Sequence, residues 1–217
     1  EGRSDIRGLQ PDTASHHQPR VAGQPVRCRM NGDIGCVVLA AGSSERLGMP
    51  KALIRVGEGN LIGWLVSRLQ ARGLEPLVVT NGDIIEEVTD SVDCRVIVNP
   101  EPEAGRTGTL QVGISHLESN IRQRILVVPV DRPGFSDSTL ESLISSVVTS
   151  CPVEGGRGGH PILLSVEDAV RITESPPSTP LRDLIDPNRI EVTDLHLHLN
   201  VDRPENLGAL ADAFVDL

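Results

Sequence analysis

Apolar residues along the chain follow two alternating periods, and together these predict an α/β fold. Continuous apolar runs are typical of strands buried on both faces of a parallel sheet, and they occur at residues 37–40, 76–80, 95–98 and 124–130. Between the runs, apolar residues recur at helical spacing, as from Leu61 to Leu69. This alternation favours a mostly parallel sheet with helices on both faces, a three-layer α/β/α sandwich.

Further elements are predicted from caps and from weaker periodicity. Asn60 and Ser136 each precede an apolar helical face and can act as N-caps. The face that follows Ser136 extends to Val147 and Val148. Additional helices are predicted at residues 83–91, 166–172, 178–186 and 203–215, and additional strands at 190–193 and 195–199.

The loop after the first apolar run has a composition that suits a triphosphate. The small residues from Ala41 to Ser44 let the backbone turn tightly and present its N–H groups to an anion. Arg46 and Lys51 follow, and Lys51 is the only lysine in a chain with 19 arginines. A lysine ammonium is a compact point charge that is useful beside a phosphate. We therefore expect phosphate binding at this loop.

Two widespread phosphate-binding loops do not fit this stretch. A P-loop requires G-x-x-x-x-G-K-[ST], but here Gly42 and Gly48 are too far apart and the lysine comes late. A dinucleotide-binding turn requires G-x-G-x-x-G, but here the turn has one glycine. The loop belongs to another class.

The stretch V-V-L-A-A-G-S-S-E-R-L-G-M-P-K, from Val37 to Lys51, resembles the L-A-A-G-x-S-x-R-x-G-x-P-K motif of the MobA-like nucleotidyltransferases. Within this family, the stretch most resembles the molybdenum cofactor cytidylyltransferases. Later segments match family elements in the same order: G-R-T-G-T-L-Q-V-G, V-D-R-P, G-H-P and N-V-D-R-P-E-N-L. The resemblance covers roughly residues 34–217 and implies a Rossmann-like nucleotidyltransferase fold.

The resemblance also implies which residues bind nucleotide. Lys51, Arg46 and Asp131 would be the catalytic residues. Thr109 replaces a usual serine and keeps its hydroxyl, although a loop followed by an ordinary helix explains the same segment. The implied nucleotide-binding residues are Leu39, Ala40, Ala41, Gly42, Ser43, Ser44, Arg46, Lys51, Gly105 and Thr109.

A magnesium site is predicted at the ends of two strands. Asp131 follows the run at 124–130, and ligands of open α/β sheets bind at the carboxyl ends of strands. Mg²⁺ prefers one or two carboxylates together with substrate phosphates. The resemblance implies a second metal contact at Asn200, our first choice, or Asp202. The alternative for Asp131 is a helix N-cap or a turn residue.

A substrate loop for the acceptor is implied at Arg132, Gly159 and His160. Arg132 departs from the family, which commonly has Gln or Met there, and it would pair with a substrate phosphate or face solvent. For His160, two roles are open: it would donate a hydrogen bond to a substrate phosphate, or it would orient the loop. His196 and His198 share a face, but no third ligand at suitable spacing makes them a metal site.

The implied reaction is Mg²⁺-dependent transfer of CMP from CTP to a phosphate monoester, molybdopterin, with release of pyrophosphate. Ala41 favours the cytidylyl branch, because guanylyl relatives commonly read L-A-G-G. The open alternatives are guanylyl transfer, another acceptor such as a sugar or polyol phosphate or a deazaflavin precursor, and a non-catalytic nucleotide-binding relative, to which Arg132 and Arg203 point. Transient contact with a molybdoenzyme or its chaperone is also implied.

Composition narrows the partners and the location. The net charge of −10 and the scarcity of aromatic residues argue against binding of nucleic acid. No run of about 18 apolar residues exists to span a membrane. Four cysteines without a C-x-x-C pair indicate free thiols in a reducing cytoplasm. We expect a domain at residues 34–217 after a disordered tail at 1–33, in which Met30 is a candidate start.

Overall fold

The computed structural model describes residues 34–117 and 123–217. The tail predicted at residues 1–33, with Met30 and Cys28, lies outside the described residues. The three remaining cysteines, Cys36, Cys94 and Cys151, are free, as expected. In the described ranges, no helix is long and apolar enough to cross a membrane.

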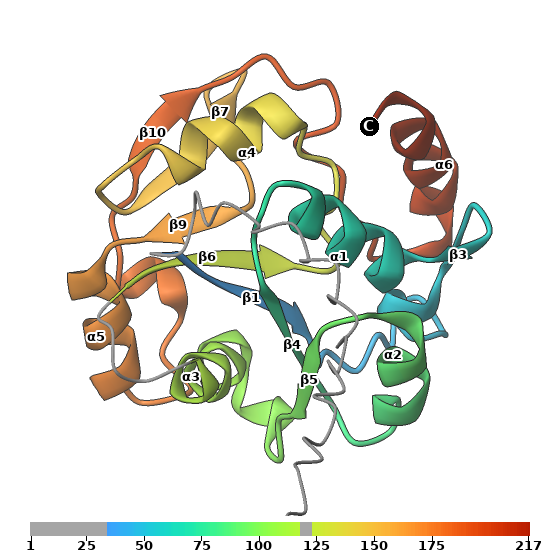
Figure 1. Cartoon of the computed structure of the whole chain (residues 1–217), viewed down its shortest axis with the longest axis horizontal. Helices are drawn as coiled ribbons and strands as arrows, with labels where there is room; N and C mark the ends of the chain where they lie inside the picture. Colours follow the sequence, from blue (N-terminus) through green and yellow to red (C-terminus); the bar gives the residue numbers. More distant parts are fainter. Residues whose placement is uncertain (1–33, 118–122) are drawn as a thin grey trace, which may run out of the picture.

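The described strands form an eight-stranded, mostly parallel sheet in the order β10-β7-β9-β6-β1-β4-β5, with β8 paired to β7 (Figure 1). The parallel pairs are β5–β4, β4–β1, β1–β6 and β7–β10, whereas β9 and β8 pair antiparallel to their neighbours. A separate hairpin joins β2 (Arg55–Val56) to β3 (Gly59–Asn60). The sheet strands are β1 (Ile34–Ala40), β4 (Pro76–Thr80), β5 (Arg95–Val98), β6 (Arg124–Pro129), β7 (Ser150–Glu154), β8 (Arg157–Gly158), β9 (Ile162–Leu164) and β10 (Asn188–Glu191).

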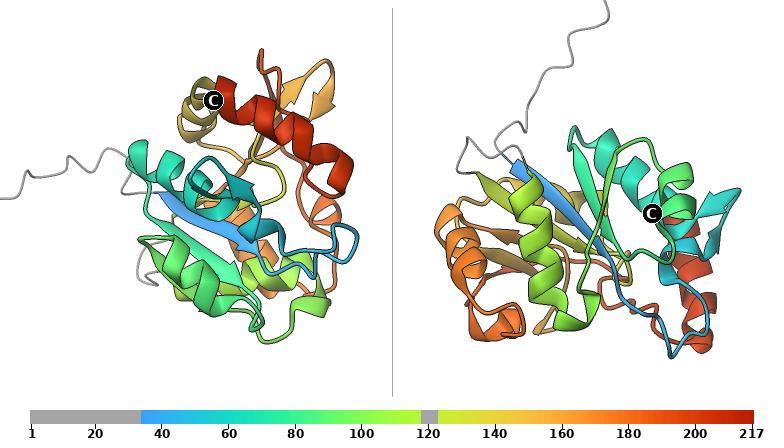
Figure 2. Two further views of the ribbon diagram at one scale, coloured as in Figure 1. Left: turned by 90° about the vertical axis from the view of Figure 1, so that its right-hand side faces the viewer. Right: turned by 90° about the horizontal axis from the view of Figure 1, so that it is seen from below.

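Helices cover both faces of this sheet and complete the predicted three layers. Because side chains alternate along a strand, Cys36 and Val38 of β1 pack in a core with α1, α2, α4 and α6, while Val37 and Leu39 pack with α3 and α5. Figure 2, right, looks onto the face covered by α3 and α5. The α-helices are α1 (Leu61–Ala71), α2 (Ile85–Ser91), α3 (Arg106–His116), α4 (Asp137–Ile144), α5 (Val166–Glu174) and α6 (Leu207–Asp216).

Local sequence signals located several elements correctly. The strands at 76–80 and 95–98 have the predicted bounds. The Asn60 side chain accepts a hydrogen bond from the Gly63 N–H at 3.0 Å and caps α1, and Ser136 caps α4 through the Thr139 N–H at 3.3 Å. An N-cap depends only on its own side chain and on the first turn of the helix that follows, so the sequence alone was sufficient to predict both caps.

Three predictions were wrong. Residues 195–199 form consecutive turns rather than a strand, with Leu197 N–H donating to Asp194 and Leu199 N–H to His196. Of the helix predicted at 178–186, only a 3₁₀ turn at Leu181–Asp183 exists, because the prolines around it remove backbone donors. The fourth helix ends at Ile144, and Val147 and Val148 are 77% and 50% exposed.

The irregular segment at 194–199 packs against the loop that follows β6. The buried Asp194 carboxylate accepts hydrogen bonds from the Ser136 N–H at 2.6 Å and the Thr139 hydroxyl at 2.8 Å. A Cβ added at Gly134 would lie 2.0 Å from the backbone oxygen of His196. Tertiary contact of two loops, and not strand pairing, therefore fixes this part of the chain.

We expect Gly134→Ala to destabilise the fold by about 1–3 kcal/mol, since overpacking against backbone cannot be relieved by a rotamer change. The measurement is the free energy of unfolding in urea. Gly208→Ala is the matched control, because a Cβ there meets nothing within 4 Å and removal of a helical glycine is stabilising by about 0.5–1 kcal/mol. Equal stability of the Gly134→Ala variant and the parent would contradict the loop contact.

Candidate functional site

A cavity of about 460 Å³ opens at the carboxyl ends of β1 and β6. All ten residues proposed from the sequence for nucleotide binding line it, from Leu39 in β1 to Thr109 in α3, and so do Asp131 and Asp202. Asn200, Arg132, Gly159 and His160 are not among the lining residues. The lining residues that sequence reasoning missed are Glu45, Ala52, Ile84, Pro102, Arg106, Pro129 and Val130.

The loop after β1 folds back on itself around Ser44. The Ser44 backbone oxygen accepts hydrogen bonds from the N–H groups of Leu47 and Gly48, and its hydroxyl oxygen accepts one from the Lys51 N–H at 3.1 Å. Ser44 has a φ of 57°, in the left-handed region, which costs a residue with a side chain roughly 1–2 kcal/mol. The bonds to Ser44 hold the strained turn and place Lys51 at the cavity.

The side chain of Lys51 joins the two carboxylates at the centre of the site. Its Nζ lies 2.7 Å from Asp202 Oδ1 and 3.3 Å from Asp131 Oδ2. Arg46 approaches the other oxygen of Asp202 at 3.1 Å. Hydrogen bonds from Lys51 and Arg46 lower the pKa of Asp202 to about 2. The Lys51 side chain is 15% exposed, whereas that of Arg46 is 73% exposed, so Lys51 is the inner cation.

Backbone contacts bring Asp131 and Asp202 together from distant parts of the chain. The Val201 N–H donates to the Asp131 backbone oxygen at 2.9 Å, and the Val130 N–H donates to Leu39 at 3.0 Å. The Asn206 side chain accepts a hydrogen bond from the Arg203 N–H at 3.0 Å. Of the two residues proposed as the second metal contact, the fold thus brings Asp202 to Asp131 and leaves Asn200 off the cavity lining. The ligand role of either residue stays a prediction.

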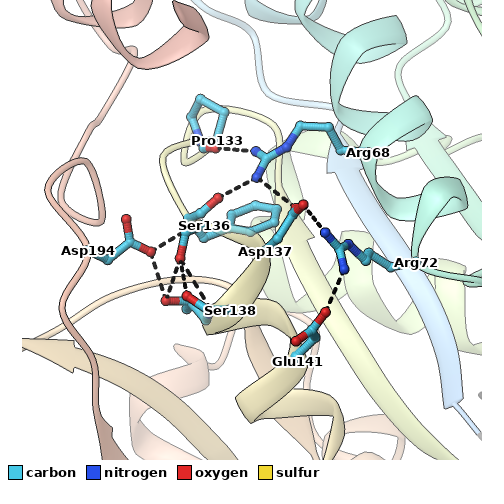
Figure 3. A network of polar contacts seen from close by, with 10 residues as sticks. Arg68, Arg72, Pro133, Ser136, Asp137, Ser138, Glu141 and Asp194 are labelled. Atoms are coloured by element: carbon cyan, nitrogen blue, oxygen red, sulfur yellow. Dashed lines mark hydrogen bonds and ion pairs between the residues drawn. The ribbon is translucent and has the colours of Figure 1, made fainter. Parts of the chain in front are cut away.

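Arg68 of α1 binds the backbone of the loop that carries Asp131 (Figure 3). Its guanidinium donates to the backbone oxygens of Pro133 at 3.2 Å and Phe135 at 2.6 Å, and it lies over the rings of Trp64 and Phe135. Asp137 pairs with Arg68 at 3.5 Å and also with Arg72. Arg68 is only 9% exposed, so the loop is anchored by a buried, multiply bonded side chain.

The residues present fit a Mg²⁺ ion that arrives with its substrate. Two carboxylates converge on one ammonium, so the position between them accepts positive charge. No group of three His, Cys, Asp or Glu side chains in the described part of the chain could hold a metal by itself. Mg²⁺ binds in this way, through one or two carboxylates with phosphate oxygens and water filling the remaining positions.

The residues of the predicted substrate loop, Arg132, Gly159 and His160, lie outside the cavity lining. Burial, together with the charges of Arg106 and Arg132, lowers the pKa of His160 to about 4, so its ring is neutral at neutral pH. His160 Nδ1 and Arg132 Nε are buried without a hydrogen-bond partner among the described residues. A Cβ at Gly159 would lie 2.6 Å from the Leu197 side chain, so Gly159 permits close packing there.

The hydroxyl of Thr109 is engaged by the protein. It accepts a hydrogen bond from the Asn99 side chain at 3.0 Å and donates to the Gly105 oxygen at 3.1 Å. Gly105, with a φ of 104°, precedes Arg106 at the start of α3. Thr109 thus fixes the helix start, and a glycine directly before a predicted helix was the sequence signal that pointed to this turn and to Arg106.

Comparison with known proteins identifies a family for this chain. A family model described as the MobA-like NTP transferase domain matches residues 36–192. A probable molybdenum cofactor guanylyltransferase of Bacillus mycoides is 28% identical over 139 residues, 62% of this chain and 68% of the relative. The molybdenum cofactor cytidylyltransferase of Escherichia coli is 19% identical over 192 residues, 85% of this chain and 98% of the relative.

Among solved structures, the Rv0371C protein of Mycobacterium tuberculosis, determined in complex with manganese, has a similar fold. The TM-score is 0.62 at 18% identity, over 83% of this chain and 98% of the other. At this identity the likeness concerns the fold alone.

We expect Lys51→Met to raise the affinity of the nucleotide-free protein for Mn²⁺ by about ten-fold, because the carboxylates lose their inner cation and attract another. Free Mn²⁺ is measured by electron paramagnetic resonance. Arg55→Met is the control, since it removes one positive charge from an exposed side chain outside the site. If both variants bind Mn²⁺ equally, Lys51 does not occupy the cation position.

Proposed function

The chain belongs to the MobA-like NTP transferase family, whose members are nucleotidyltransferases, and we propose that it transfers CMP from CTP to molybdopterin with the aid of Mg²⁺. The observation that carries this proposal is the convergence of Lys51, Asp131 and Asp202 in a cavity lined by the small-residue loop. Anion-binding and cation-binding groups thus stand side by side, as a metal-bound triphosphate requires.

In this reaction the protein mainly positions the two substrates and neutralises the negative charge of their phosphates. An oxygen of the acceptor phosphate forms a bond to the α-phosphorus of the nucleotide. The bond from the α-phosphorus to its bridging oxygen breaks, and the electron pair leaves with pyrophosphate. The attacking group is already an anion, so no proton must be removed from it. Charge on the leaving pyrophosphate is what the site has to stabilise.

Each group has a separate task in the proposed site. The loop from Ala41 to Ser44 would hold phosphate oxygens through its N–H groups. Lys51 and Arg46 would leave the carboxylates and neutralise the triphosphate. Asp131 and Asp202 would hold Mg²⁺, which when bound neutralises phosphate oxygens and orients them for in-line displacement. The cations thus have a partner both before and after the nucleotide binds.

The identities of the donor and of the acceptor rest on two separate observations. Ala41 lines the cavity, and a methyl group at this point narrows the space for a purine. A steric difference of this kind is worth about 1–3 kcal/mol. Molybdopterin as acceptor, and with it transient contact with a molybdoenzyme or its chaperone, is supported by two distant relatives that are named for the molybdenum cofactor.

A pyrophosphate-release assay with molybdopterin tests the proposal. We expect CTP to be used at least about ten-fold better than GTP, no turnover in chelator, and a loss of about 10²–10³ in Asp131→Asn. Asp83→Asn, an exposed control outside the site, should match the parent.

Each contrary outcome removes one part of the proposal. Equal use of GTP overturns the donor, and turnover in chelator overturns the metal. Release with a sugar or polyol phosphate but not with molybdopterin overturns the acceptor. Nucleotide binding without release with any acceptor would indicate a non-catalytic relative.

A further inference from the structure

The Trp and Phe residues of this chain, which has no Tyr, are Trp64, Phe135 and Phe214, and all three belong to one stack of side chains. The ring centroids of Trp64 and Phe214 lie 5.6 Å apart in an edge-to-face arrangement. The guanidinium carbon of Arg68 lies 5.0 Å from the centroid of the Trp64 ring and 4.9 Å from that of the Phe135 ring. Such contacts have a preferred geometry. We call the series Phe214, Trp64, Arg68 and Phe135 the aromatic stack.

One end of the aromatic stack lies in the loop that carries Asp131. Phe135 follows Asp131 by four residues and is fully buried. Arg68 binds the same loop, because its guanidinium donates hydrogen bonds to the backbone oxygens of Pro133 at 3.2 Å and Phe135 at 2.6 Å (Figure 3). The position of this loop therefore depends on where Arg68 lies in the stack.

The other end of the stack lies on α6, the helix that follows Asp202. Directly before this helix, the side-chain oxygen of Asn206 accepts hydrogen bonds from the N–H groups of Asp202 at 3.4 Å and Arg203 at 3.0 Å. The helix itself is held in the core, where Leu210 and Ala213 are buried. The packing of α6 thus fixes the backbone at Asp202.

Phe214 of α6 also rests on the segment that follows Lys51. A Cβ added at Gly57, in the turn between β2 and β3, would lie 2.8 Å from Cζ of Phe214. The ring therefore lies directly on this hairpin, beside which α6 runs (Figure 1). The hairpin follows the turn at Lys51, whose backbone oxygen accepts a hydrogen bond from the Ile54 N–H at 3.3 Å. One helix thus contacts the chain on both sides of the ion pair between Lys51 and Asp202.

We propose that Trp64 and Phe214 are positioning residues for the divalent cation, because the aromatic stack holds Asp202 and the loop of Asp131 at the separation that suits one ion. The inference rests on the proposed transfer reaction, in which these two carboxylates bind Mg²⁺. Mg²⁺ requires near-ideal octahedral geometry with oxygen ligands at about 2.1 Å, so a small shift of one carboxylate weakens its binding. Residues that orient metal ligands without touching the ion affect its affinity for this reason.

Binding of Mn²⁺ alone to the full chain tests this role without turnover. Free Mn²⁺ is measured by electron paramagnetic resonance, at a temperature where circular dichroism shows each variant fully folded. We expect Phe214→Leu and Trp64→Leu each to weaken Mn²⁺ binding by about ten-fold, as for other residues that orient metal ligands indirectly. Trp64→Phe keeps a ring between Phe214 and Arg68, so it should stay within about two-fold of the parent.

Two controls separate positioning from a general loss of stability. Ile172→Val removes a buried methylene from the core on the other face of the sheet, so it destabilises the fold without touching the stack. Val215→Ala changes an exposed side chain of α6 next to Phe214. Both should leave Mn²⁺ binding within about two-fold of the parent, since distant sites act independently. If Trp64→Leu fails to fold, Phe214→Leu decides, because Phe214 is 36% exposed.

The inference is overturned if the parent does not bind Mn²⁺, if the leucine variants bind it like the parent, or if Trp64→Phe binds it as weakly as Trp64→Leu. It is also overturned if Ile172→Val weakens binding as much as the leucine variants do. A protein in which the leucine variants lose Mn²⁺ affinity, but whose parent releases no pyrophosphate, would lose the proposed function and keep the positioning role. Pyrophosphate release by a parent whose leucine variants bind Mn²⁺ normally would have the opposite meaning.

Discussion

The ion pairs of Lys51 with Asp131 and Asp202 are the interaction on which the rest of the site depends. The carboxylates come from segments about 70 residues apart in the sequence, and the Lys51 ammonium bridges them at 2.7 Å from Asp202 and 3.3 Å from Asp131. Without a cation, two adjacent carboxylates would repel. In the proposed reaction the cation moves from the carboxylates to phosphate oxygens when nucleotide binds. Lysine suits this movement, since its point charge binds either partner at little geometric cost, whereas an arginine fork is bound more directionally.

The ion pairs depend in turn on packing far from the cavity. The loop that carries Asp131 is held by Arg68 on one side and by the segment around Asp194 on the other (Figure 3). Gly134 allows the two segments to approach to backbone contact. Arg68 and Asp194 are buried and each makes at least two hydrogen bonds to this part of the chain, so the loop is positioned before any ligand arrives. Preorganisation of this kind is what a transfer reaction with little covalent chemistry requires.

The sequence predicted the central strands and the nucleotide loop because their signals are local. Apolar runs, caps and the spacing from Val37 to Lys51 need no knowledge of the rest of the chain. The turns at 195–199 were predicted as a strand, because alternation of leucine and histidine has the same period as a strand and only tertiary contact distinguishes the two. Which of Asn200 and Asp202 lines the cavity likewise depends on tertiary contacts, among them the backbone bond from Val201 to Asp131. Arg106 was missed, although it lines the cavity, since none of the recognised motifs assigned it a role.

The central claim is that a metal-bound triphosphate takes the place of Lys51 between the two carboxylates. A crystal structure with Mn²⁺ and a non-hydrolysable CTP analogue tests it most directly, because manganese is located by its anomalous scattering. The account predicts one Mn²⁺ bound by an oxygen of Asp131, an oxygen of Asp202 and the phosphates, with the Lys51 ammonium moved onto phosphate oxygens. A nucleotide bound while Lys51 still bridges Asp131 and Asp202, or a metal bound elsewhere, would contradict it.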